Sequence, residues 1–185
     1  MRKLTCALLC LLMILSTAFC LTGCKSRSDE MSDLETYTTK QMTKTKKQVI
    51  KCINEQDKEG LKKLFSKDAQ KHIEDLDSKL DQFINTFNGN KIESAKGRSP
   101  AFEGSAQTQP LHIYGEYHLS LNSEEKYRIY ISLCDKNDKD PDKEGVFKIE
   151  LRTFSREESP KDFSGGTYKD DYGIFIYTLQ NYPKE

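Results

Sequence analysis

The spacing of apolar residues divides the chain into an apolar start, a helical part and a strand part. Residues 4–21 carry no charge. Between residues 42 and 87 apolar positions recur every three or four residues, which is the period of an amphipathic helix. From residue 91 onward they alternate with polar residues, which is the period of a strand. The pattern therefore predicts N-terminal helices followed by a sheet.

Three helices are predicted, over residues 42–54, 61–65 and 66–87. Ser66 has the right side chain to cap the start of the third helix, and Gly89 suits the left-handed position after its end. The predicted buried stripe of the third helix steps by three or four residues through Ala69, Ile73, Leu76, Leu80, Phe83, Ile84 and Phe87.

The strand part begins with a weakly apolar strand at residues 91–99 and a loop at 99–110. Three stronger strands follow, at 111–121, 127–133 and 147–151, each with one apolar and one polar face. Their predicted apolar sides hold Leu111, Ile113, Tyr117, Leu119 and Leu121, then Tyr127, Ile129, Ile131 and Leu133, then Phe147, Ile149 and Leu151. The run at 172–177 is a further strand or a docked C-terminal segment. A meander of this kind covers helices with one face, so we expect an α+β fold in which the helices pack on an antiparallel sheet.

The apolar start has the features of a secretion signal. Arg2 and Lys3 precede the uncharged run, and Leu21-Thr22-Gly23-Cys24 follows it. These four residues match the lipobox of bacterial lipoproteins. The resemblance implies cleavage before Cys24 and acylation of its thiol, with diacylglycerol and palmitate-type chains as a membrane anchor. An uncleaved anchor helix is the alternative, and in both cases the remaining chain lies on the extracytoplasmic face of the cell membrane.

Cleavage would change the composition of the chain. Residues 1–23 are then a lipoprotein signal peptide, residues 24–40 a polar flexible spacer, and residues 41–185 one domain. Loss of Arg2 and Lys3 leaves 27 basic and 29 acidic side chains. This near-neutral balance argues against nucleic acid as a partner, which requires a basic surface.

Two cysteines remain in the domain, Cys52 and Cys134. Outside the cytoplasm they could form a disulfide. Cys52 lies beside the apolar stripe of a helix, and Cys134 lies at the end of a strand, at a position that belongs to its polar face. The sequence therefore gives no geometric support for the pair.

The order of elements resembles the NTF2-like (cystatin-like) superfamily over residues 38–155. The segment 53–66 (INEQDKEGLKKLFS) is similar to a helix-turn-helix of that superfamily. The ending Phe87-Asn88-Gly89 and the tail Gly173–Ile176 look like small clostridial-type lipoproteins of unknown function. The resemblance implies a curved sheet wrapped around the helices as a cone, with either a ligand pocket at the open end or a dimer interface on the outer sheet face.

Three groups of residues would suit metal binding or acid–base chemistry. The first has zinc-ligand types on one strand face, the second has part of the spacing of a calcium loop, and the third lies beside the apolar stripe of a helix. The groups are His112, Glu116 and His118; Asp138, Asp140 and Asp142; and His72 with Asp75, Asp77 or Asp81. Ordinary solvent-exposed side chains are the simpler interpretation of each, so no metal or cofactor is predicted.

Tyrosine and arginine gather on the polar strand faces, at Tyr114, Arg128, Tyr130 and Arg152. These residue types are enriched at protein interfaces. We therefore expect a membrane-anchored lipoprotein with a non-enzymatic domain that binds a protein partner or a second copy of itself through this face. A small-ligand-binding cone, or an enzyme of the isomerase or dehydratase type, is the alternative.

Overall fold

The computed structural model describes residues 27–104, 110–161, 163 and 171–183. The signal sequence, the lipobox and Cys24 lie outside these residues. Residues 34–185 form one compact unit, and it is this unit whose fold is given below. No helix among the described residues combines the length and the apolar composition needed to cross a membrane.

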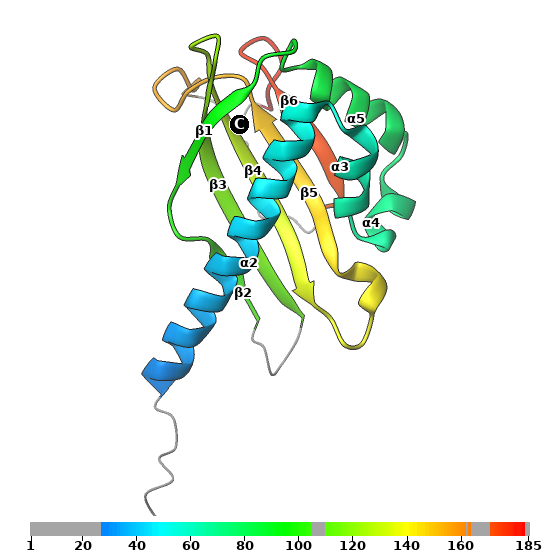
Figure 1. Cartoon of the computed structure of the whole chain (residues 1–185), viewed down its shortest axis with the longest axis vertical. Coiled ribbons are helices and arrows are strands. Elements are labelled where there is room, and N and C mark those ends of the chain that lie inside the picture. Colours follow the sequence, from blue (N-terminus) through cyan, green and yellow to red (C-terminus); the bar gives the residue numbers. More distant parts are fainter. Residues whose placement is uncertain (1–26, 105–109, 162, 164–170, 184–185) are drawn as a thin grey trace, which may run out of the picture. The chain divides into compact units, whose positions relative to one another are not determined.

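The unit is α+β, with helices first and a six-stranded, mostly antiparallel sheet after them (Figure 1). The sheet has the order β1-β3-β4-β5-β6, and β2 also pairs with β3. The helices are α2 (Arg27–Glu55), α3 (Lys58–Leu64), α4 (Lys67–His72) and α5 (Leu76–Asn85), with a 3-10 turn η1 at Pro141–Lys143. The strands are β1 (Ile92–Gly97), β2 (Ala101–Glu103), β3 (Leu111–Leu121), β4 (Lys126–Lys136), β5 (Gly145–Arg152) and β6 (Gly173–Tyr177).

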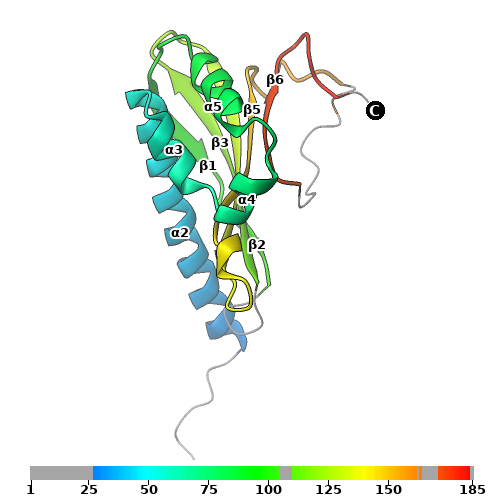
Figure 2. The same cartoon turned by 90° about the vertical axis from the view of Figure 1, so that its right-hand side faces the viewer.

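The helices lie on one face of the sheet, as Figures 1 and 2 show together. Their apolar stripes and the apolar sides of the strands form one core. Phe65, Phe83 and Phe87 are buried in it, at 3%, 0% and 2% exposure. The helix side of the sheet is therefore filled by side chains, and any larger cavity must lie elsewhere.

Helix α2 extends the predicted first helix toward the N-terminus. Residues 27–40, which we expected to be a flexible spacer, are helical. Thr38 and Thr45 are buried on the same side as Met42 and Val49. Because Thr38 occupies a position before Met42 where a stripe normally has an apolar residue, the hydrophobic period alone starts the helix too late.

The predicted long helix at 66–87 is two helices. Ser66 caps α4 as expected, with its hydroxyl accepting a hydrogen bond from the Ala69 backbone N–H at 3.0 Å. Ile73 then leaves the helical region, and Asp75 adopts a left-handed conformation with φ of 50°. The stripe of apolar residues continues across the break, so the sequence pattern does not reveal it.

The predicted alternation of β3 is confirmed, since its apolar side is buried and its other side is partly exposed. In β5 the prediction is wrong for Phe147. Ser132 pairs with Lys148 but Leu133 pairs with Val146, which leaves Phe147 as an extra residue in β5. Such a bulge reverses the side of the sheet to which the next residues point. Phe147 consequently packs on His112 and Tyr114, on the polar face, at ring-centroid distances of 5.4 and 6.3 Å.

Both ends of the sheet differ from a simple antiparallel meander. The predicted loop at 99–110 contains β2, which continues the edge that β1 forms on β3. At the opposite edge β6 is a strand, but it runs parallel to β5. Among the described residues between these two strands, Phe154 and Phe163 lie beside Arg128 and Arg152 of the polar face.

Candidate ligand-binding site

The register of β3, β4 and β5 arranges the polar side chains of the sheet in three rows. Residues that face each other across antiparallel strands have Cβ atoms within about 5.5 Å. One row is cationic, the next holds two carboxylates and the third is mostly uncharged. They are His118–Arg128–Arg152, Glu116–Tyr130–Glu150 and Tyr114–Ser132–Lys148.

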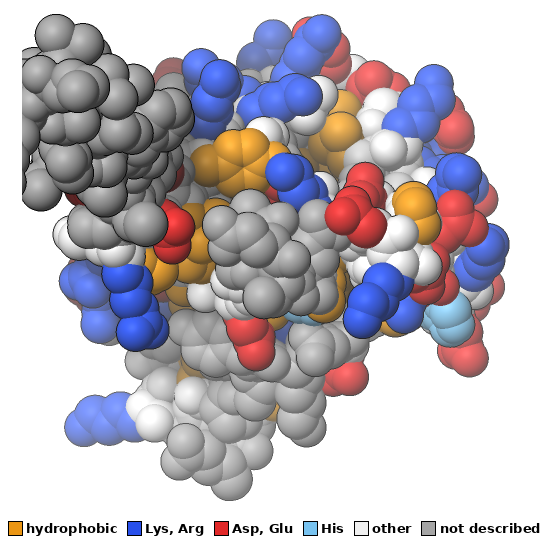
Figure 3. All heavy atoms as spheres, turned by 90° about the horizontal axis from the view of Figure 1, so that it is seen from below, with side chains coloured by type: hydrophobic (Ala, Val, Ile, Leu, Met, Phe, Trp, Pro, Cys, Tyr) orange, Lys and Arg blue, Asp and Glu red, His pale blue; other side chains and the backbone are white. Residues whose placement is uncertain are grey.

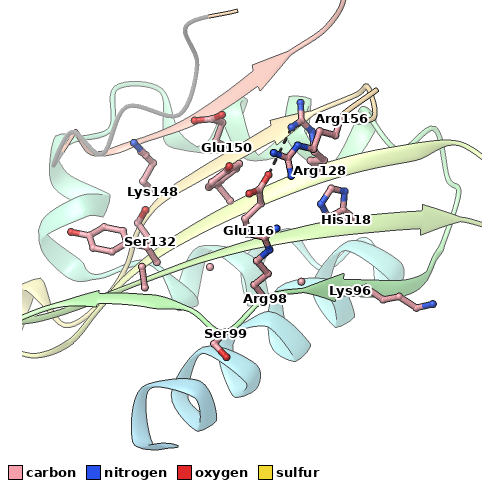
Figure 4. Close-up of a pocket in the computed structure, with 15 residues that line it drawn as sticks. Lys96, Arg98, Ser99, Glu116, His118, Arg128, Ser132, Lys148, Glu150 and Arg156 are labelled. Atoms are coloured by element: carbon pink, nitrogen blue, oxygen red, sulfur yellow. Dashed lines mark ion pairs between the residues drawn. The ribbon is translucent and has the colours of Figure 1, made fainter. Parts of the chain in front are cut away.

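A cavity of about 730 Å³ lies over these rows (Figure 4). Its floor includes Ser132, Lys148 and Glu150, which are 5%, 7% and 2% exposed. Its rim comes from the end of β1, from the turn between β1 and β2 and from the segment after β5. It includes the exposed residues Lys96, Arg98 and Arg156. The cavity thus has a buried polar floor and a charged, accessible rim.

Gly97 lets the rim approach the floor. A Cβ atom on this residue would lie 2.2 Å from the carbonyl oxygen of Glu116. Any side chain here would push β1 away from β3, so only glycine allows the close approach of the two backbones.

Arg128 is the least satisfied charged group of the floor. It is 5% exposed, and its one ion pair among the described residues joins Nη1 to Glu116 Oε1 over 3.8 Å. Nε and Nη2 have no hydrogen-bond partner in the described part of the chain. Burial, and after it the charge of Arg152, lowers the pKa of Arg128. A buried guanidinium with open donors is a group that a ligand would stabilise.

Arg152, the neighbour of Arg128 across the strands, is well compensated by contrast. Its Nε donates a hydrogen bond to Glu150 Oε1 at 2.7 Å, and its Nη2 lies 2.5 Å from the same oxygen as an ion pair, without the geometry of a hydrogen bond. Its guanidinium lies over the rings of Tyr130 and Phe163, each at 4.5 Å from the ring centroid. Arg152 therefore serves to hold Glu150 and Tyr130 in place.

Tyr130 remains a protonated phenol over the physiological pH range. Burial, followed by a hydrogen bond with Glu116, raises the pKa of Tyr130 well above its ordinary value. The hydroxyl is thus a neutral group in the middle of the carboxylate row.

The structure brings the four predicted partner-binding residues onto one face, but not onto an open surface. Tyr114, Arg128 and Tyr130 line the cavity, and Arg152 lies beneath them at 4% exposure. The burial of both guanidinium groups leaves little of them for another protein to contact. Sequence reasoning missed the rim, because Arg98 and Arg156 lie outside the regular alternation of the strands.

Lys148 and Glu150 were also missed as candidates. Their alternation with apolar residues assigns them to the polar face, but that pattern looks the same for exposed and for buried polar residues. Their burial is decided by tertiary packing, in which Phe163 from the segment after β5 lies over the ring-facing guanidinium of Arg152 beside Glu150.

A smaller cavity of about 240 Å³ lies at the other end of the polar face. Phe147, Tyr172 and His112 line it, together with Cys134. Burial, with Glu144 and Asp135 as smaller causes, raises the pKa of the Cys134 thiol to about 11. A thiol with so high a pKa is a poor nucleophile. Cys52 and Cys134 are both free and buried.

The residues considered for metal binding do not converge. The described residues contain no cluster of three or more His, Cys, Asp or Glu side chains suited to a metal ion. His112 contacts aromatic rings, whereas Glu116 pairs with Arg128. Asp142 pairs with Lys67 and Lys71 across 3.2 and 3.3 Å.

The candidate acid–base residues of the helices also point to other partners. His72 is exposed and stacks on Tyr172 with a centroid distance of 5.3 Å. Asp77 and Asp81 pair with Lys62 and Lys58.

The charges of the visible described surface are mixed. Seen from below, Lys and Arg side chains are interspersed with Asp and Glu (Figure 3).

One of two comparisons with known proteins gave a match. The profile of a family described as "Domain of unknown function (DUF5104)" matches residues 48–157, which is more than half of the chain. A comparison with curated proteins gave no match. The matched segment includes all the residues that line the larger cavity.

Proposed function

We propose that this chain, which belongs to the DUF5104 family of unknown function, is a membrane-anchored lipoprotein whose domain takes a small ligand into the cavity on the polar sheet face. One observation carries the binding role, namely the nearly buried Arg128 with two open donors at the floor of a cavity. Natural small-molecule sites have volumes of about 300–1,000 Å³ and a few convergent polar groups, and this cavity falls in that range.

The anchoring part of the proposal rests on the sequence alone. Leu21, Thr22 and Gly23 before Cys24, after a basic start and an uncharged run, support lipidation of Cys24. Cleavage there would place the domain on the extracytoplasmic face of the cell membrane. An NTF2-like cone remains the proposed fold family, supported by the helices that pack on one face of the sheet.

The anchor is tested by Cys24→Ser in the full chain, expressed in a bacterium fed a labelled fatty acid. We expect the wild-type chain to carry the label and to sediment with membranes, and Cys24→Ser to carry none. Label on Cys24→Ser, or none on the wild type, would contradict lipidation at this residue.

We assign the domain a binding role rather than a catalytic one. Most charged groups of the cavity are cations, and its two carboxylates, Glu116 and Glu150, are paired with arginines. The alternative, an isomerase or dehydratase, would use Glu116 and Tyr130 for proton transfer, since these two groups are hydrogen-bonded at the cavity. A protein partner or a second copy of the chain at the exposed rim is the other alternative.

The binding role is tested by filling the cavity. Ser132→Phe places a ring on the floor, and Ala101→Trp places one on the exposed rim. Ser120→Phe is the matched control, because Ser120 is an exposed residue of β3 away from the cavity lining. The full chains are purified in a mild detergent and examined by native mass spectrometry for a bound small molecule.

We expect a bound species on the wild type and on Ser120→Phe that both cavity variants lose. A bound species that survives both cavity variants would show that the cavity is not the site. Loss of self-association or of a captured protein in the rim variant alone would favour the protein-partner alternative instead.

A further inference from the structure

The lining of the large cavity has an excess of positive charge. Five cationic side chains reach it, against the two carboxylates Glu116 and Glu150. The cations are Lys96, Arg98, Arg128, Lys148 and Arg156. An excess of three positive charges in a partly enclosed space attracts anions and strengthens their binding.

The arginines gather at one end of the cavity. Figure 4 shows Arg98, Arg128 and Arg156 near Glu116 and His118, whereas Lys148 and Ser132 lie toward the other end. The three guanidinium groups come from the β1–β2 turn, from β4 and from the segment after β5. Segments far apart in the sequence thus converge on one point with the same charge.

Two donors of Arg128 have no hydrogen-bond acceptor among the described residues, whereas the buried Arg152 has Glu150 as an acceptor. Glu150 serves Arg152 at 2.7 Å, but Glu116 lies 3.8 Å from Arg128 and contacts Nη1 only. Nε and Nη2 are the two adjacent donors of the guanidinium fork, and both are open among the described residues. This fork matches two oxygens of one phosphate or carboxylate.

The number of cations decides between these two anions. A single carboxylate would neutralise one charge and use one guanidinium. A phosphate ester carries up to two charges at neutral pH and offers three acceptor oxygens, enough for Arg128 and both rim arginines. The volume of about 730 Å³ also leaves room for the organic part of an ester beside Tyr114 and Ser132.

We propose that the cavity binds a phosphate ester, with Arg128 holding the phosphoryl group from the floor and Arg98 and Arg156 closing on it from the rim. This inference rests on the proposed small-ligand function and names the chemical class of the ligand. The phosphoryl group comes either from a soluble ester or from the headgroup of a phospholipid, since the proposed anchor keeps the domain beside a membrane.

The test measures binding to the full chain in non-ionic detergent by titration calorimetry. Glycerol phosphate is the probe, and succinate is the carboxylate comparison. We expect Arg128→Gln to weaken glycerol phosphate binding about tenfold or more, because charge-assisted bidentate hydrogen bonds are lost. Lys47→Gln, an exposed cation of α2, is the matched control and should leave binding unchanged.

Arg98→Gln and Arg156→Gln keep the test valid if Arg128→Gln fails to fold. Both residues are exposed, so their replacement leaves the core intact. Each should weaken binding of glycerol phosphate, and added salt should weaken it further, because the interaction is electrostatic. Equal binding by wild type and all three arginine variants would overturn the assignment.

Two further arms separate the remaining outcomes. Flotation of the full chain with phosphatidylglycerol vesicles is compared with phosphatidylcholine vesicles for the wild type and the three arginine variants, so that the anchor contributes equally to every sample. Arginine-dependent flotation supports the lipid source, and calorimetric binding without arginine-dependent flotation supports a soluble ester. Binding of succinate but not of glycerol phosphate, or no binding of either, overturns the phosphate class. The small-ligand function fails only if the cavity-filling variants keep the bound species of the wild type.

Discussion

Glu150 Oε1 accepts a hydrogen bond from Arg152 Nε at 2.7 Å, in a layer where the two residues are 2% and 4% exposed. The pair lies between the apolar core and the residues that follow β5, and Phe163 covers it. It is an internal ion pair that fixes the polar face of the sheet. Removing one partner leaves the other as a buried charge without a counter-ion, which costs more stability than breaking an exposed pair.

Glu150→Gln should lower the free energy of unfolding by about 3–5 kcal/mol, because the charge of Arg152 then stays buried without a counter-ion. Glu116→Gln is the control, since Glu116 is partly exposed and its partner lies 3.8 Å away. Urea unfolding followed by circular dichroism gives both values. A smaller loss for Glu150→Gln than for Glu116→Gln would contradict the described pairing.

Arg128→Met and Arg152→Met should change stability in opposite directions, although the two residues face each other across β4 and β5. Arg128→Met removes a buried cation with two open donors and should keep or raise the free energy of unfolding, by about 1 kcal/mol or more. Arg152→Met leaves Glu150 buried alone and should lower it by about 3 kcal/mol. Thermal unfolding without phosphate checks both. Equal destabilisation would show that Arg128 has acceptors after all.

Asn54→Leu should destabilise the domain by about 1–3 kcal/mol, because a buried backbone pair loses its side-chain partner. The Asn54 amide donates to the Ile92 carbonyl at 3.0 Å and accepts from the Ile92 N–H at 2.8 Å, which ties α2 to β1. Asn90→Ala removes an exposed contact with Glu125 at 3.4 Å and should change stability by less than about 0.5 kcal/mol. Urea unfolding of the two variants side by side is the measurement.

Alkaline pH should destabilise the fold through Cys134. The pKa of this thiol is raised from the ordinary value of 9.0 to about 11, mainly by burial. Between these two values the unfolded chain loses the proton while the folded chain keeps it, so the free energy of unfolding falls as pH rises from about 9 to about 11. Below pH 9 both states keep the proton, and the effect is absent.

The measurement compares urea unfolding at several pH values for Cys52→Ala and for Cys52→Ala with Cys134→Ala. The double variant should show a shallower decline between pH 9 and 11, whatever its stability at neutral pH. Alkylation of Cys134 in folded Cys52→Ala should likewise stay slow until the pH approaches 11. Fast alkylation at pH 8 would show that the thiol is accessible and not held neutral by burial.

Much of the sheet could be predicted because its strands follow the pleat. The alternation of β3 assigns Ile113 and Tyr117 to the core and Tyr114 and Glu116 to the other face, and the structure agrees. The period does not detect a single extra residue, which is why Phe147 was assigned to the wrong face. The period also does not detect the helix break at Asp75, because the apolar stripe continues on both sides of the break.

The candidate site was predictable only in part. Residue type and alternation select Tyr114, Arg128 and Tyr130 for a protein-binding face, and the structure places these three side chains in the cavity lining. Protein binding through them stays a prediction. Arg98 and Arg156 come from segments without regular period, so no sequence pattern connects them with Arg128. Their approach depends on Gly97 and on the course of the chain after β5.

The sequence by itself determined the α+β class, the order of helices before strands and which side chains of β3 share a face. These properties follow from local period and turn chemistry, which act over a few residues. Only the tertiary structure decided that the polar face is covered, because that depends on packing between residues far apart in the chain. The packing buries Arg128 with two donors that have no partner among the described residues. It also places Glu150 beside Arg152 as a hydrogen-bond acceptor.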